Sequence, residues 1–226
     1  MEKLTLEPIA HIRSDFPEKF GIPRQSGLVD ALEAEVVFAP EYRVPEALRG
    51  LEGFSHLWLI WEFSAARREG WSPTVRPPRL GGNVRMGVFA TRSPFRPNPL
   101  GLSCVRLVDI RQDAALGPVL RVAGADLMDG TPIYDIKPYL PHADCVPEAT
   151  GGFAAAHVGD GLTVICSPEL LAPVPEGKRA ALLGILAQDP RPAYQQDPER
   201  EYALSFAGFT VRFRVREGEL TVTGIE

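Results

Sequence analysis

The sequence has little of the chemistry that builds metal sites or covalent cross-links. Its three cysteines, Cys104, Cys145 and Cys166, are widely spaced and form no CxxC pair. The four histidines are scattered and show no HExxH arrangement. Closely spaced thiols or histidines are the usual signature of zinc sites and disulfide frameworks. The sequence therefore predicts a protein without a metal site and without a disulfide framework.

Long hydrophobic runs are also missing. The longest apolar stretches, such as residues 57–61, are far shorter than the roughly 20 residues that a membrane-spanning helix needs. The first seven residues lack the basic region and apolar core of a signal peptide. We therefore expect a cytoplasmic protein with no membrane span. A composition of 45% hydrophobic and 23% charged residues in 226 is that of a globular protein.

Acidic residues are absent from one long stretch of an otherwise acidic chain. The net charge is −5, yet no Asp or Glu occurs between Glu69 and Asp109. Arginine presents a planar fork suited to phosphates and stacked bases, and a locally basic surface attracts a polyanion. Codon bias is the simpler explanation for 20 Arg against 4 Lys, but it does not explain the missing acids. The arginines of this stretch are Arg76, Arg79, Arg85, Arg92, Arg96 and Arg106.

Proline and short apolar segments indicate the fold class. Proline occurs 22 times, which excludes long helices from most of the chain. Short β-like segments between turns predict strands at residues 35–39, 56–63, 85–90, 102–110 and 119–125. Residues 56–63 are apolar on both faces, as in a central strand or a barrel wall. We predict a mainly β fold with a small, mostly antiparallel β-barrel.

A second, smaller unit is predicted after Gly151, where the composition changes. A strand at residues 162–166 is followed by a helix at 176–188, which Pro190 ends. Strict alternation at 209–216, a Glu-Gly turn and a return at 219–225 predict a hairpin. We therefore divide the chain into a β-barrel domain, 1–150, and a small α+β domain, 151–226. Arginines on one face of the first hairpin strand form either a solvated surface or an anion contact.

The densest polar cluster lies in a proline-rich stretch between residues 76 and 99. Proline stiffens a loop, so that Arg92, Arg96 and their polar neighbours stand at fixed positions and lose little entropy on binding. The glycine pair at 81–82 fits neither a Walker loop nor a dinucleotide fingerprint. We interpret this stretch as functional. Near position 190, Arg191 and Tyr194 form a second arginine–proline segment, suited to holding a phosphate and stacking on a base.

Three aspartates flank a Gly-Thr-Pro turn that follows a predicted strand. Asp126, Asp129 and Asp135 are suited to accept hydrogen bonds from a ligand amine or ribose, or to act as a general base. Ordinary turn chemistry is a strong alternative for Asp129, because Asp-Gly favours turns. Lys137 is an alternative partner for either of the other two.

These motifs resemble the TsaA-like tRNA methyltransferases of the TrmO type. The resemblance rests on Pro23-Arg24-Gln25, on residues 76–102 and on residues 126–141, while residues 189–194 resemble a motif of the family's bacterial C-terminal domain. It implies an S-adenosylmethionine-dependent enzyme built on a small β-barrel rather than a Rossmann sheet. The implied reaction methylates the exocyclic nitrogen of threonylcarbamoyl-adenosine beside the anticodon of tRNA. The resemblance also implies a homodimer.

The same resemblance implies the site residues. Relatives commonly have His where this chain has Ser64, so a contact through the backbone is expected there. The implied cofactor-binding residues are Pro23, Arg24, Gln25, Ser64, Ala65, Arg92, Leu102, Gly124, Ala125 and Asp126. Asp126, Asp129 and Asp135 are the candidates for handling the proton of the acceptor nitrogen. The expected tRNA-binding residues are Arg76, Arg79, Arg85, Arg96, Arg191, Tyr194, Arg212, Arg214 and Arg216.

Two other function classes are compatible with parts of this pattern. A non-catalytic module that binds S-adenosylmethionine or RNA would keep the barrel and the loop that carries Arg92 and Arg96 (the arginine loop) but transfer no methyl group. A hydrolase based on Asp126 with Asp129 or Asp135 would turn over without S-adenosylmethionine. The sequence offers the hydrolase neither a plausible metal set nor a nucleophile. A covalent cysteine route of methyl transfer is not expected either, because no cysteine lies in any of the motifs.

Overall fold

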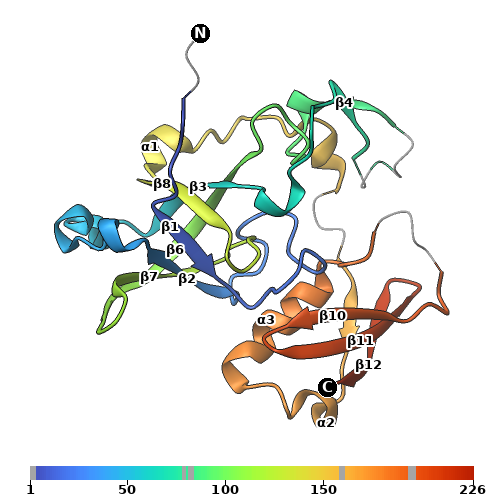
Figure 1. Ribbon diagram of the computed structural model, residues 1–226. Helices are drawn as coiled ribbons and strands as arrows, with labels where there is room; N and C mark the ends of the chain where they lie inside the picture. Colours follow the sequence, from blue (N-terminus) through green and yellow to red (C-terminus); the bar gives the residue numbers. More distant parts are fainter. Residues whose placement is uncertain (1–3, 78–79, 81–83, 158–160, 193–196) are drawn as a thin grey trace.

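The computed structural model describes residues 4–77, 80, 84–157, 161–192 and 197–226. A barrel sheet and a second, four-stranded sheet lie beside one another (Figure 1). Six antiparallel strands form a closed barrel in the order β1-β2-β7-β6-β3-β8. They are β1 (Ala10–Arg13), β2 (Glu33–Phe38), β3 (His56–Glu62), β6 (Leu100–Asp113), β7 (Gly117–Ala123) and β8 (Pro132–Pro138). The predicted mainly β fold is confirmed. None of the described helices is both long and apolar enough to cross a membrane.

The barrel interior is filled by alternate side chains of its strands. On β3, Leu57, Leu59 and Trp61 are buried, and the residues between them lie on the outer, half-buried face. Leu120 and Ile133 from β7 and β8 join the same core. Full burial of one such side chain stabilises a fold by about 1.5–3 kcal/mol, so this alternation fixes the strand register.

The predicted strand at 85–90 is wrong for most of its length. Only Met86–Gly87 form a strand, β5, which pairs with the equally short β4 (Thr74–Val75). The following residues turn into a 3₁₀-helix, η6 (Val88–Ala90), in which Val88 is buried. Strands β1 and β8 were not predicted, because β1 is short and β8 begins and ends with proline.

The second sheet has the order β10-β11-β12-β9, with β9 parallel to β12. Its strands are β9 (Thr163–Ile165), β10 (Tyr202–Phe206), β11 (Phe209–Arg216) and β12 (Glu219–Ile225). The predicted hairpin and the helix α3 (Glu176–Ala187) are confirmed, whereas β10 was not predicted. The short helices are α1 (Pro141–Asp144), α2 (Pro168–Leu171), η1 (Pro40–Tyr42), η2 (Pro45–Leu48), η3 (Leu51–Gly53), η4 (Ser64–Ala66) and η7 (Gly152–His157).

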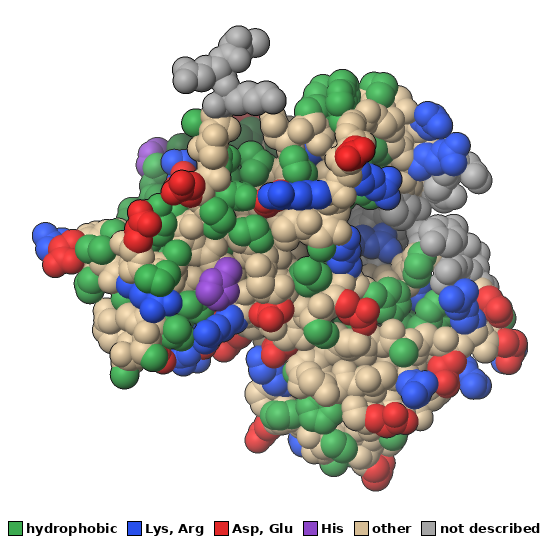
Figure 2. Space-filling model, viewed as in Figure 1, with side chains coloured by type: hydrophobic (Ala, Val, Ile, Leu, Met, Phe, Trp, Pro, Cys, Tyr) green, Lys and Arg blue, Asp and Glu red, His purple; other side chains and the backbone are tan. Residues whose placement is uncertain are grey.

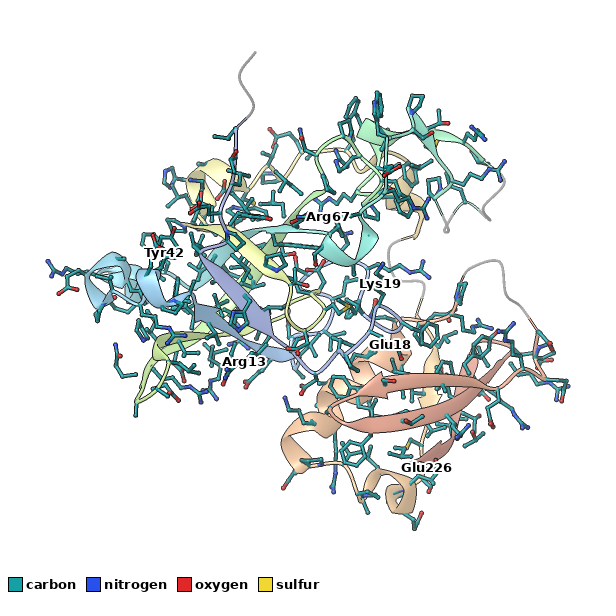
Figure 3. All side chains as sticks on the ribbon, viewed as in Figure 1. Arg13, Glu18, Lys19, Tyr42, Arg67 and Glu226 are labelled. Atoms are coloured by element: carbon teal, nitrogen blue, oxygen red, sulfur yellow. The ribbon has the colours of Figure 1, made fainter. Side chains whose placement is uncertain are left out.

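The segment between β1 and β2 connects the barrel to the second sheet. Phe16 and Leu32 are buried in the core of that sheet. Glu18 accepts a hydrogen bond from Ser205 at 2.7 Å, while Lys19 donates to the carbonyl oxygen of Ala65 beside the barrel (Figure 3). A segment from the barrel half of the chain therefore completes the second core. The division at residues 150/151 stays a prediction.

Gly21 lies where this segment meets the second sheet, and its replacement is expected to destabilise the protein. Its φ is +92°, and a Cβ added to it would lie 1.9 Å from Cδ1 of the buried Leu204. Gly21→Ala is expected to lower the free energy of unfolding by about 2–4 kcal/mol, because backbone strain and overpacking add. Urea denaturation measures the loss.

Gly50→Ala is the matched control for this prediction. Gly50 has a similar φ of +89°, but nothing lies within 4 Å of an added Cβ. Its replacement is expected to cost only the backbone strain, about 1–2 kcal/mol. Equal losses in the two variants would mean that the contact with Leu204 does not require glycine at position 21.

Candidate functional site

Three of the segments singled out from the sequence meet beside the start of β6. The backbone N–H of Gly27 donates to the carbonyl oxygen of Gly124 at 2.9 Å. Arg92 donates from Nη1 to Oε1 of Gln25. Residues 23–27, the arginine loop and the segment after β7 are thus joined to one another, although they are far apart in the sequence. We call this arrangement the barrel-end site.

Gly124 allows the close approach of two of these segments. It has a φ of +78°, and an added Cβ would lie 3.2 Å from both Cα and N of Gly27. Only glycine adopts such a backbone freely and leaves this space. The turn carries the chain from β7 to Asp126, whose neighbours Gly124 and Ala125 are buried.

Asp126 is the carboxylate at the centre of the barrel-end site. Its Oδ1 accepts a hydrogen bond from Ser103 Oγ at 2.5 Å, and Ser103 Oγ in turn accepts one from Trp61 Nε1 at 2.9 Å. Burial raises the pKa of Asp126, and the bond from Ser103, the charge of Arg92 and the N–H of Ser26 offset this only in part. A carboxylate with a raised pKa is a better proton acceptor than an ordinary aspartate.

The residues that hold Asp126 were missed in the sequence analysis. Gly101 faces Trp61 across the β3–β6 pair, and an added Cβ would lie 2.3 Å from the indole ring, so the ring lies over the glycine. This position directs the indole N–H to the buried Ser103. Glycine and serine on the buried face of an apolar strand are the signal that marks such a position.

The remaining predicted cofactor residues lie on several different elements. Leu102 is 52% exposed and precedes Ser103 on β6, and Pro23 is buried. Ser64 and Ala65 form η4 just after β3. Arg24 donates from Nη2 to the carbonyl oxygen of Arg191 at 3.2 Å. This hydrogen bond connects residues 23–25 to the segment that follows α3.

A buried glutamate anchors the turn that follows β3. Glu62 accepts hydrogen bonds from both Nε and Nη2 of Arg67, the latter at 2.7 Å, and from the hydroxyl of Tyr134 at 2.5 Å (Figure 3 labels Arg67). The bonds from Arg67 lower the pKa of Glu62, whereas burial and the nearby Glu62 raise the pKa of Tyr134. This network fixes both ends of the segment that contains Ser64 and Ala65.

The other two aspartates have partners elsewhere. Asp129 accepts a hydrogen bond from the backbone N–H of Ser14 at 3.0 Å and closes a turn against β1. Asp135 lies on β8, where it accepts from the N–H of Ile136 and forms an ion pair with Lys137 at 3.0 Å. Asp126, by contrast, interacts with the charge of Arg92 and with the N–H of Ser26, next to the predicted Gln25.

The predicted tRNA-binding arginines fall into three groups. Arg76 and Arg85 are exposed near the β4–β5 pair, while Arg96 donates to the carbonyl oxygen of Thr91 at 2.8 Å and so fixes its own loop. Arg191 is largely buried and binds both carboxylate oxygens of Asp189 at 2.9 Å. Arg79 and Tyr194 lie outside the described residues.

The arginine face of the hairpin is less basic than its sequence indicates. Arg212 lies 3.6 Å from Glu226, and Arg214 lies 3.5 Å from Glu201. Arg216 is exposed. These acids come from other parts of the chain, so the pattern of one strand could not reveal them.

A separate charged hollow lies between the barrel and α3. It encloses about 230 Å³ and includes Arg13, Arg121 and Lys178 in its lining. Two of these cations have acidic partners, because Lys178 pairs with Asp15 at 2.5 Å and Arg121 pairs with Asp109 at 2.6 Å. Among the described residues, no group of three or more His, Cys, Asp or Glu is placed to hold a metal ion. The barrel-end site therefore remains the candidate functional site.

Comparison with known proteins gives matches over nearly the whole chain. The tRNA-methyltransferase O N-terminal domain matches residues 11–145, and the TrmO C-terminal domain matches residues 164–226. The Escherichia coli (strain K12) protein named tRNA (adenine(37)-N6)-methyltransferase is 44% identical over 236 residues, covering 100% of this chain and 99% of the relative.

Two proteins from Pseudomonas aeruginosa are also similar. One, RcsF, carries the provisional name of an S-adenosylmethionine-dependent methyltransferase and is 45% identical over 208 residues, covering 88% of this chain and 87% of the relative. The other is TrmO, whose crystal structure superposes on this chain with a TM-score of 0.79 at 33% identity. The match covers 100% of both chains.

Proposed function

The chain belongs to the TrmO family of tRNA methyltransferases, and on this premise we propose that its substrate is a tRNA carrying threonylcarbamoyl-adenosine next to the anticodon. The protein is an S-adenosylmethionine-dependent tRNA (adenine-N6)-methyltransferase. The observation that carries the assignment of the site is the meeting of Gln25, Arg92 and Asp126 at one end of the barrel.

The chemistry of the barrel-end site fits the cofactor. S-adenosylmethionine supplies an electrophilic methyl group and carries an ammonium, a carboxylate, ribose hydroxyls and an adenine. We propose that Arg92 and Arg24 bind its carboxylate and that Leu102 packs against its adenine. The half-buried carboxylate of Asp126 complements its positive charge or its ribose. Gly27 has nothing within 4 Å of an added Cβ, so its backbone is open for a close approach of the cofactor.

We propose that Asp126 also handles the proton of the acceptor nitrogen. A nitrogen bonded to a carbamoyl carbonyl is weakly nucleophilic, so removal of its proton assists attack on the methyl group. General-base assistance of this kind contributes about 10²–10⁴-fold to a rate. Positioning of the two reactants supplies a further large part of the acceleration.

The two sheets are proposed to divide the work. We propose that domain 1–150 binds the cofactor and that domain 151–226 helps to hold the tRNA through Arg191, Tyr194 and the hairpin arginines. Arg76, Arg79, Arg85 and Arg96 are proposed to bind the tRNA from the barrel side. We further propose that the protein is a cytoplasmic homodimer, which the family resemblance supports and light scattering tests.

The substrate proposal predicts that methyl transfer depends on the existing modification of the tRNA. Labelled methyl groups from S-adenosylmethionine are offered to two tRNAs with the same anticodon loop, one carrying threonylcarbamoyl-adenosine and one an unmodified transcript. Label is expected in the modified tRNA only. Equal label in both would contradict the requirement for the threonylcarbamoyl group, and no label in either would favour a non-catalytic binding module.

A further inference from the structure

Two exposed aromatic side chains form a pair on the segment that runs from Trp71 through β4 and β5 to Phe89, and we call the described residues of this segment the arm. Trp71 is 53% exposed and Phe89 is 71% exposed, yet their ring centroids lie only 6.1 Å apart with an interplanar angle of 30°. Exposed aromatic rings leave a large apolar area in water, which is unfavourable in the free protein. Such a pair marks a surface that a partner covers.

The arm holds the two rings in place before any partner arrives. Thr74 pairs with Gly87 and Val75 with Met86, and the N–H of Val88 donates to the carbonyl oxygen of Pro73 at 2.9 Å. Val88 is buried beside the exposed Phe89, so η6 is anchored on one side and presents the ring on the other. A rigid pair loses little conformational entropy on binding.

The charge around the pair favours an anionic partner. No acidic residue occurs between Glu69 and Asp109, whereas Arg76 and Arg85 are exposed on the same arm. Arg85 donates to Thr74 Oγ1 at 3.1 Å, which keeps its guanidinium on the arm. Figure 2 shows basic side chains next to hydrophobic ones where Figure 1 places β4. A second copy of this arm would bring arginines against arginines.

The place of the pair in the chain connects it to the barrel-end site. Phe89 is in η6, and the next residues, Thr91 and Arg92, begin the arginine loop that contacts Gln25. The chain therefore runs from the aromatic pair directly into a residue of the barrel-end site. Phe95, the other aromatic residue of the stretch, is covered by the guanidinium of Arg68, which lies 3.8 Å from the ring centroid.

We propose that Trp71 and Phe89 form a stacking platform for an unpaired base of the tRNA anticodon loop. Aromatic side chains bind single-stranded bases through their faces, and arginines beside them bind the phosphates. This inference rests on the proposed function. To the arginines that are proposed to bind the tRNA, it adds a surface that binds a base by stacking. The platform would hold the loop while the target adenosine enters the barrel-end site.

The test compares the full-length protein with Trp71→Ala, Phe89→Ala and the double variant, using an unmodified tRNA transcript as the probe. Each single variant is expected to weaken tRNA binding about 5- to 100-fold, which is the usual effect of losing one base–aromatic stack. The Kd of S-adenosylmethionine and the salt dependence of tRNA binding are expected to stay unchanged, because no phosphate contact is removed. Trp71→Phe is expected to restore most of the affinity.

Val146→Ala is the control, because Val146 is an apolar side chain of similar exposure, 54%, outside the arm. Its tRNA affinity should equal that of the parent. Unchanged tRNA binding in the double variant would overturn the proposal. Dissociation of a dimer in the double variant would also overturn it, since the pair would then be a subunit contact. The probe lacks the threonylcarbamoyl group, so a failure of the substrate proposal leaves this test intact.

Discussion

Replacing Asp126 with Asn is expected to lower the kcat of methyl transfer by about 100-fold or more, because general-base assistance is worth about 10²–10⁴-fold. Asn keeps the size of the side chain and accepts the hydrogen bond from Ser103, but it does not accept a proton. The measurement is single-turnover transfer to modified tRNA at saturating S-adenosylmethionine. Asp135→Asn, which only loses an exposed ion pair with Lys137, is the matched control and should keep the parent rate.

The Asp126→Asn variant should not be less stable than the parent protein at neutral pH. Burial raises the pKa of Asp126 above its ordinary value of 3.8, so the folded protein favours the protonated carboxyl more than the unfolded chain does. The stability linked to this group is therefore complete below about pH 3.8 and is lost as the pH rises through the raised pKa. The side-chain amide of the Asp126→Asn variant carries no charge and avoids that loss, so activity and stability should change in opposite directions.

The pH dependence of the parent follows from the same shift. Activity that needs ionised Asp126 should fall on acidification with a midpoint above 3.8, and this limb should be absent from the residual activity of Asp126→Asn. If Asp126→Asn bound S-adenosylmethionine weakly but retained the parent kcat at saturation, this would contradict the role of Asp126 in proton transfer. Asp126 would then hold the cofactor only.

Replacing Arg92 with Met is expected to raise the Kd of S-adenosylmethionine about 10- to 100-fold, because a hydrogen bond to a charged group contributes about 1.5–3 kcal/mol. Arg92 is exposed, contacts Gln25 and acts on the charge of Asp126, so its guanidinium is available to a carboxylate at the barrel-end site. Titration calorimetry measures the change. Arg92→Lys should give an intermediate loss, since lysine keeps the charge but not the planar fork.

Arg111→Met is the control for the Arg92 variant. Arg111 belongs to the same barrel but pairs with Glu35 outside the barrel-end site. Its replacement should leave the Kd of S-adenosylmethionine unchanged. If Arg92→Met bound S-adenosylmethionine like the parent and only lost affinity for tRNA, Arg92 would belong to the RNA-binding surface instead.

The sequence predicted those elements whose hydrophobic pattern is regular. The alternation of β11 and β12 predicted both strands and their turn, and the apolar spacing of 176–188 predicted α3. Strand β8 was missed because prolines and charged residues lower β-propensity. Its prolines lie at the two ends, which a strand tolerates, and its pairing with β3 supplies the missing preference.

The candidate site was predicted in its segments but not in its contacts. The resemblance to a family indicated residues 23–25, Arg92 and 124–126, and the structure joins them through Gln25 and Gly27. The Trp61–Ser103–Asp126 chain could not be predicted, because it depends on the register that sets Trp61 opposite Gly101. The ion pairs of the hairpin arginines depend likewise on contacts between distant residues.

Amide hydrogen exchange with and without S-adenosylmethionine tests the location of the site most directly. The account predicts slower exchange with the cofactor in residues 23–27, 91–96 and 124–126 and at the start of β6, where the amide of Cys104 donates to Ser26. It predicts no change at the hollow lined by Arg13, Arg121 and Lys178. Slowing confined to that hollow, with the three segments unchanged, would contradict the assignment of the barrel-end site.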